Sequence, residues 1–275
     1  MAAGVNPPII DTAVAAWRDA LRAMLAMPTI AGIAFVITVA LAVVTLFISP
    51  DPIAGKAGLV SHFLSFVLNI INAFLIAPLA IAVHRYVLLS EVTSGYSIDP
   101  SNPRYLRFVT FSLAILLMFA VPGWILDALY SPPTIDPKTD PKILEESLGL
   151  SIAIPLVIVA VLIPLIIVVL RRIILFPAIA VDAAGASWNN AQRDTKGHSW
   201  RVAFVFICVT IPLIVIELPF IFPMDPSSPK LTGLLIVGTI IAVPVVCAYA
   251  AAASHLFRAL ADNLTRPLGS APPTI

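Results

Sequence analysis

Charged side chains are scarce in this chain, and their scarcity sets its structural class. Of 275 residues, only 11% are Asp, Glu, Lys or Arg, whereas 60% are hydrophobic. A soluble globular protein carries about 25% charged residues, which cover its surface with groups that water solvates. The mean hydropathy of +1.01 points the same way. These values exclude a water-soluble globular fold.

Motifs for catalysis and metal binding are also missing. The chain has two cysteines and four histidines, and none of them forms a Cys-x-x-Cys or His-Glu-x-x-His pattern. It contains neither a Gly-x-Ser-x-Gly nucleophile turn nor a phosphate-binding P-loop. We therefore expect no enzymatic activity and no cofactor. The net charge of +1 gives no reason to expect a nucleic-acid partner.

The chain does contain long stretches without charged residues. A helix needs roughly 20 apolar residues to cross the hydrocarbon core of a bilayer. Five stretches lack Asp, Glu, Lys and Arg altogether, and a sixth contains only Glu217; they are 23–50, 57–84, 108–126, 147–170, 231–257 and, with Glu217, 202–224. The sequence thus predicts an all-α, polytopic integral membrane bundle of six transmembrane helices. We assign residues 28–257 to this membrane domain.

The basic residues are distributed unevenly between the two sides of this bundle. Twelve of the sixteen Lys and Arg residues fall in the N-terminal segment, the second and fourth loops and the C-terminal tail. Basic residues in short loops favour the cytoplasmic side. The pattern predicts a multi-pass protein with its N-terminus and C-terminus in the cytoplasm, and a cytoplasmic tail at 258–275.

Two further helices are expected on the cytoplasmic side. Residues 1–27 hold an amphipathic helix, whose apolar residues recur at helical spacing: Ile10, Val14, Trp17, Leu21 and Met24. Such a helix lies flat in the headgroup region, and Pro28 then begins the first span. In the fourth loop, Ser187 fits the N-cap of a short helix and Gly197 fits its C′ position.

Three stretches carry a family resemblance. RRIILFPAIAVDAAGASWNNAQRDTKGHSWR at 171–201, PLAIAVHRYVLL at 78–89 and SHLFRAL at 254–260 are similar to segments of six-helix bacterial inner-membrane proteins of unassigned function. The resemblance covers about a third of the chain. It implies the bacterial cytoplasmic (inner) membrane as the location. It brings no activity, cofactor or catalytic residue with it.

A polar stripe marks the second span. His62, Ser65, Asn69 and Asn72 recur at positions i, i+3, i+7 and i+10 of one helical face. Polar groups in a bilayer are costly and invite a functional explanation. Two explanations stand: hydrogen bonds that join neighbouring helices, or one wall of a polar pathway. They differ in whether the stripe is sealed against a helix or faces a hydrated cavity.

Ionisable residues at the two ends of the spans add further candidates. Glu217 lies in the outer part of the fifth span between Pro212 and Pro219, and prolines can break a helix at a transporter's binding site. A proton- or cation-coupling role and a carboxylate that simply reaches water both fit it. At the cytoplasmic ends, Arg85, Arg171 and Arg172 are candidate contacts for lipid headgroups.

These features favour a non-enzymatic structural, assembly or accessory membrane protein. Its expected partners are membrane lipids and either another membrane protein or a second copy of the chain. The alternative is a small transporter or channel with a polar pathway along the second span. The sequence leaves the choice between them open.

Overall fold

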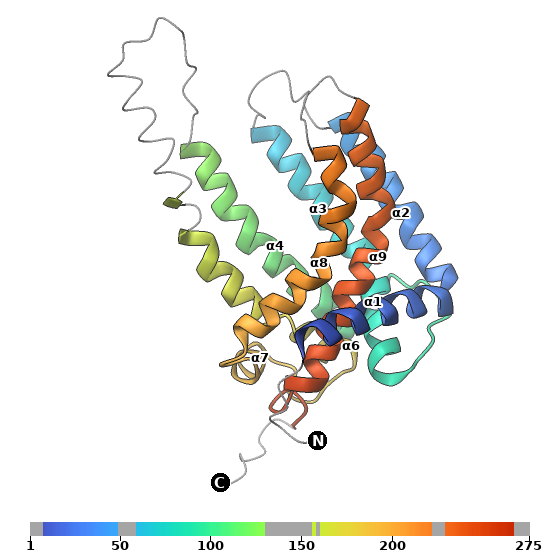
Figure 1. Ribbon diagram of the computed structural model, residues 1–275, viewed down its shortest axis with the longest axis vertical. Coiled ribbons are helices and arrows are strands. Elements are labelled where there is room, and N and C mark those ends of the chain that lie inside the picture. Colours follow the sequence, from blue (N-terminus) through green and yellow to red (C-terminus); the bar gives the residue numbers. More distant parts are fainter. Residues whose placement is uncertain (1–7, 49–58, 130–155, 158–159, 222–228, 267–275) are drawn as a thin grey trace, which may run out of the picture.

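The computed structural model describes residues 8–48, 59–129, 156–157, 160–221 and 229–266. Within these ranges the chain forms helices, turns and irregular loops, and no strand. The named helices are α1 (Ile9–Ala26), α2 (Pro28–Ile48), α3 (Leu59–Leu89), α4 (Pro103–Leu129), α6 (Leu175–Ala180), α7 (Trp188–Asp194), α8 (Ser199–Ile221) and α9 (Pro229–Leu260). A further helical segment at 160–170 precedes α6 (Figure 1).

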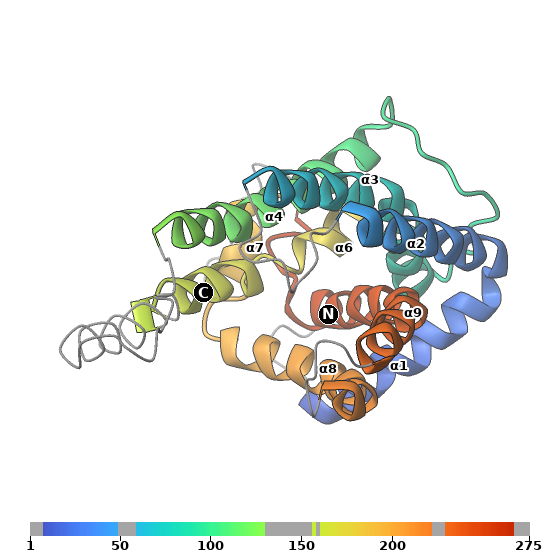
Figure 2. The same cartoon turned by 90° about the horizontal axis from the view of Figure 1, so that it is seen from above.

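Six segments of the described chain are long and apolar enough to cross a membrane. They are Pro28–Thr45, Phe63–Leu89, Pro103–Pro122, Ala160–Ala180, Ser199–Leu218 and Ile236–Leu260. Each overlaps one of the predicted spans, but the fourth extends past the predicted end at residue 170 and includes Arg171 and Arg172. The prediction of an all-α six-span bundle is confirmed. Seen from above, α4, α3 and α2 stand in one row with α8 and α9 on the other side (Figure 2).

The helix α1 does not run along the bundle but lies across α9 and α8 at one end of it (Figure 1). The predicted boundary at Pro28 is correct, since α1 closes at Met27 and α2 begins at Pro28. The residue before a proline is pushed out of the helical region, and Met27 indeed has φ −129° and ψ 58°. The chain can therefore turn sharply from α1 into the first span.

Three different faces explain the position of α1. Ile10, Val14 and Leu21 of the predicted apolar stripe are exposed. Arg18 and Arg22 are also exposed, on a neighbouring face. The buried face is made of small residues that the apolar stripe does not include, namely Thr12, Ala13, Ala16, Ala20 and Ala23. Small side chains let two helices approach closely, and α1 packs against α9, in which the alanines at 250–253 are also buried.

The α7 helix has the predicted N-cap. Ser187 has extended backbone, and its side chain accepts a hydrogen bond from the Asn190 amide. The predicted place of Gly197 is wrong by one residue. The helix ends at Asp194 with Thr195 as C-cap, so Gly197 follows the C′ residue, and its φ of +85° serves the turn that leads into α8.

Candidate functional site

A polar cavity lies between α2, α3, α8 and α9, in the half of the bundle away from α1 and α7. Its volume is about 540 Å³. Residues from all four helices line it: Thr38, Leu41, Ala42, Thr45, Ser65, Leu68, Asn69, Asn72, Glu217, Gly238, Thr239 and Ala242. A cavity of this size falls in the range that holds small ligands.

The stripe predicted on the second span faces this cavity. Ser65, Asn69 and Asn72 all line it. Asn69 also donates from Nδ2 to the Ser65 carbonyl of its own helix at 2.9 Å. The fourth member, His62, belongs to α3, but its side chain lies outside the described residues. Three of the four predicted residues therefore share one wall of the cavity.

Glu217 faces the same cavity from α8. The sequence singled out the stripe and this carboxylate separately. The fold brings them together because α8 and α3 both border α9. Among the side chains that the structure describes, none forms an ion pair with Glu217.

The sequence reasoning missed the hydroxyl groups opposite the stripe. Thr38 and Thr45 lie seven residues apart on α2, and Thr239 lies on α9 beside Gly238. A spacing of seven is two helical turns, so Thr38 and Thr45 share a face. That periodicity was a usable signal. Threonine in a span is common enough, however, that the spacing by itself does not identify a cavity.

The three candidate arginines lie at the other end of the bundle, and each is held by the protein itself. Arg85 donates to the Ala180 carbonyl at 3.0 Å and forms an ion pair with Glu91. Arg171 donates to the Ser199 hydroxyl at 2.8 Å.

Arg172 is the most enclosed of the three arginines, with only 8% of its surface exposed. Its guanidinium donates to the Val168 carbonyl and to Gln192 Oε1, and it stacks over the Trp188 ring at 4.3 Å. Its Nε has no hydrogen-bond partner. The guanidinium of Arg172 thus serves to join α7 to the preceding span, and little of it is left for a lipid phosphate.

A loop at 90–102 covers the arginine end of α3 and α4. A small cavity of about 160 Å³ lies beneath it, bordered among others by Arg85, Glu91, Asp99 and Arg104. The hydrogen bond from Arg85 lowers the pKa of Glu91. Burial raises the pKa of Tyr96 to about 12, and the Tyr96 hydroxyl donates to the Leu75 carbonyl. The ion pair between Arg85 and Glu91 fastens the loop to α3, and Arg104 pairs with Asp182.

The stretches 78–89, 171–201 and 254–260 converge at this end. His84 Nδ1 lies 2.8 Å from the Ser254 hydroxyl in the buried core between α3 and α9. Arg258 donates to the Val87 carbonyl. Together with the bond from Arg85 to Ala180, these contacts join the stretches 78–89, 171–201 and 254–260.

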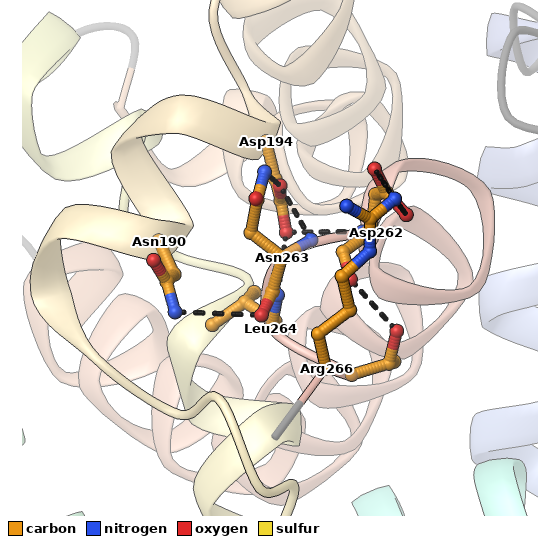
Figure 3. A network of polar contacts seen from close by, with 7 residues as sticks. Asn190, Asp194, Asp262, Asn263, Leu264 and Arg266 are labelled. Carbon is orange, nitrogen blue, oxygen red and sulfur yellow. Dashed lines mark hydrogen bonds and ion pairs between the residues drawn. The ribbon is translucent and has the colours of Figure 1, made fainter. Parts of the chain in front are cut away.

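The end of α9 is fastened to α7 by a single carboxylate. Asp194, only 9% exposed, accepts hydrogen bonds from the backbone amides of Asp262, Asn263 and Leu264 at 3.0–3.1 Å and from the Asn263 side chain at 2.6 Å (Figure 3). Successive amides that converge on one anion form a nest. This contact is structural, because the protein supplies both the anion and its donors.

No group of three or more His, Cys, Asp or Glu side chains that could hold a metal ion occurs among the described residues. No protein-family model matches the chain, and comparisons with curated proteins and with solved structures give no match either.

Proposed function

We propose that this protein is a small transporter or channel that binds a polar solute in the cavity between α2, α3, α8 and α9. The observation that supports it is the meeting of Ser65, Asn69 and Asn72 with Glu217 around one cavity. A stripe that only joined helices would be sealed against a neighbour. A stripe that lines a space of about 540 Å³ can contact a solute.

We also propose which side of the membrane the termini occupy and in which membrane the protein lies. The basic residues of the N-terminal segment, the second and fourth loops and the tail support cytoplasmic termini. The cavity then belongs to the outer half of the bundle. The resemblance of the three stretches supports the bacterial cytoplasmic membrane as its location.

Flux into proteoliposomes tests this function. The probes are radiolabelled glycerol, urea, glycine and methylammonium, which span neutral, zwitterionic and cationic solutes. At least one probe is expected to enter faster than into empty liposomes, and Asn72→Leu is expected to abolish the difference. Val215→Leu is the matched control, because Val215 is 63% exposed on α8 and absent from the cavity lining.

Two results would overturn the proposal. One is that no probe enters faster than into protein-free vesicles. The other is that Asn72→Leu lowers the stability of the bundle but leaves the flux unchanged, which would assign the stripe to helix packing.

A second candidate function is that of an accessory protein that binds lipid or a membrane partner. The exposed apolar residues of α1 favour it, since Ile10 is 71% exposed and Leu25 is 82% exposed beside the exposed Arg18 and Arg22. An apolar face beside basic groups fits a membrane interface. Native mass spectrometry of the gently extracted protein distinguishes this candidate, because a retained anionic lipid or a stoichiometric partner subunit would support it.

A further inference from the structure

Three polar side chains of the cavity lining already donate hydrogen bonds within their own helices. Thr38 donates its hydroxyl proton to the Ala34 carbonyl at 2.8 Å, and Thr45 donates to the Leu41 carbonyl at 2.8 Å. A hydroxyl has one proton and two lone pairs. Both hydroxyls have therefore used their donor within α2, and what they can offer a ligand is an acceptor oxygen.

The amide of Asn69 uses one of its two N–H donors within its own helix. Its Nδ2 donates to the Ser65 carbonyl at 2.9 Å, within α3. The second Nδ2 proton and the side-chain oxygen, which can only accept, remain for the cavity. The hydroxyl donors of Thr38 and Thr45 are thus used within α2, and their oxygens remain as acceptors for a ligand.

The cavity lining also contains an acidic side chain. Glu217 is the one ionisable residue in the lining, and the described residues around the cavity include no lysine, arginine or histidine. A carboxylate between membrane helices gains from a counter-charge.

We propose that the cavity selects small cations that carry hydrogen-bond donors, such as a primary ammonium group, with Glu217 as the counter-charge and the oxygens of Thr38, Thr45 and Asn69 as acceptors. This inference rests on the proposed function and names the class of solute for the same cavity. An anion would meet Glu217 without a compensating donor from Thr38 or Thr45. A neutral solute could donate a hydrogen bond to the carboxylate but would lack the attraction between opposite charges.

Charged thiol reagents of similar size test this selectivity without knowledge of the natural solute. Ser65→Cys is a near-isosteric change that places a thiol in the cavity. The full-length chain in nanodiscs is treated with a cationic methanethiosulfonate (ethyltrimethylammonium) and an anionic one (ethylsulfonate). The reaction of the native Cys208 and Cys247 is measured in the wild-type chain and subtracted. Ser94→Cys, at an exposed site in the loop 90–102, gives the reference ratio of the two rates.

The rate ratio of cationic to anionic reagent at Ser65→Cys is expected to exceed the Ser94→Cys ratio by about tenfold, because a cleft with charge of one sign concentrates counter-ions. Adding Glu217→Gln should return the ratio to the reference. Asp11→Asn is the matched control, because it removes an exposed carboxylate outside this cavity and should leave the ratio unchanged. Methylammonium chloride should slow the modification more than tetramethylammonium chloride, which has no N–H donor.

The possible failures are distinguishable. A ratio equal to the reference, or one that Glu217→Gln does not change, would overturn the cation selectivity and leave a cavity for neutral solutes. Equal protection by the two ammonium salts would overturn the role of the acceptor oxygens. If neither reagent reaches Ser65→Cys while Ser94→Cys reacts normally, the cavity is closed to water, and both the proposed function and this inference fail.

Discussion

The Tyr105 hydroxyl donates a hydrogen bond of 2.7 Å to the carbonyl of Phe74. That carbonyl lies four residues before Pro78, which sits inside α3 and has no N–H to give it. A bilayer offers no water to satisfy such a group, so a neighbouring helix must do so. Tyr105 of α4 is 4% exposed and fills this role, which ties the position of α4 to the proline of α3.

Tyr105→Phe removes this hydroxyl and leaves the Phe74 carbonyl without its donor. We expect the free energy of unfolding in bicelles to fall by about 1–2 kcal/mol. Tyr86→Phe is the matched control, because Tyr86 on α3 makes no hydrogen bond through its hydroxyl in the described structure, and its effect should stay within about 0.5 kcal/mol.

The proline supplies a second test of the same contact. Pro78→Ala restores an amide that can donate to Phe74 within the helix. In that background Tyr105→Phe should cost less than in the wild-type chain, as a double-mutant cycle would show. An equal cost in both backgrounds would mean that Tyr105 acts through packing alone.

Gly185 is predicted to be intolerant of any side chain. A Cβ at this position would lie 2.2 Å from the Asn263 carbonyl oxygen and 2.8 Å from that of Arg266. Gly185→Ala should therefore destabilise the fold by about 1–3 kcal/mol and raise the amide exchange of residues 261–266. Gly32→Ala is the opposite control, because a Cβ there meets nothing within 4 Å, and replacing a helical glycine by alanine stabilises by about 0.5–1 kcal/mol.

Because the buried face of α1 consists of small residues, we expect a larger side chain there to disturb its packing on α9. Ala20 is 1% exposed, so Ala20→Leu should push α1 away from α9 and lower the free energy of unfolding by about 1–3 kcal/mol. Displacement of α1 would also break the 3.0 Å hydrogen bond from Trp17 Nε1 to the Val209 carbonyl, which tryptophan fluorescence would report. Val14→Leu, at a site 62% exposed, should change neither quantity; a comparable loss there would contradict the assignment of faces.

Because Arg85 and Glu91 form an ion pair, we expect the loop 90–102 to loosen in acid. The pKa of Glu91 is lowered from its ordinary 4.5 in the folded protein. A lowered pKa gives stability that is present above 4.5 and is lost as the pH falls through the folded value. Amide exchange of residues 90–102, corrected for its intrinsic pH dependence, should therefore rise below 4.5 in the wild-type chain. In Glu91→Gln the loop should already be loosened at neutral pH, without this pH dependence.

The six spans and the cap of α7 could be predicted from the sequence because each depends on local chemistry. The thickness of the hydrocarbon core sets the length of a charge-free run, and Ser187 bonds an amide three residues away. The apolar side of α1 was also predicted. Its packing face was not, because alanines are too small to stand out in a pattern based on hydrophobicity.

Tertiary structure decided which polar groups meet. The sequence by itself established a six-span helical bundle, a stripe on the second span and an isolated carboxylate on the fifth. The packing of α2, α3 and α8 around α9 decided that Ser65, Asn69 and Asn72 share a cavity with Glu217. It also decided that Arg172 is enclosed by α7 and that Asp194 holds the end of α9. The physical reason is that periodicity fixes the face of each helix, whereas only the contacts between helices fix what that face meets.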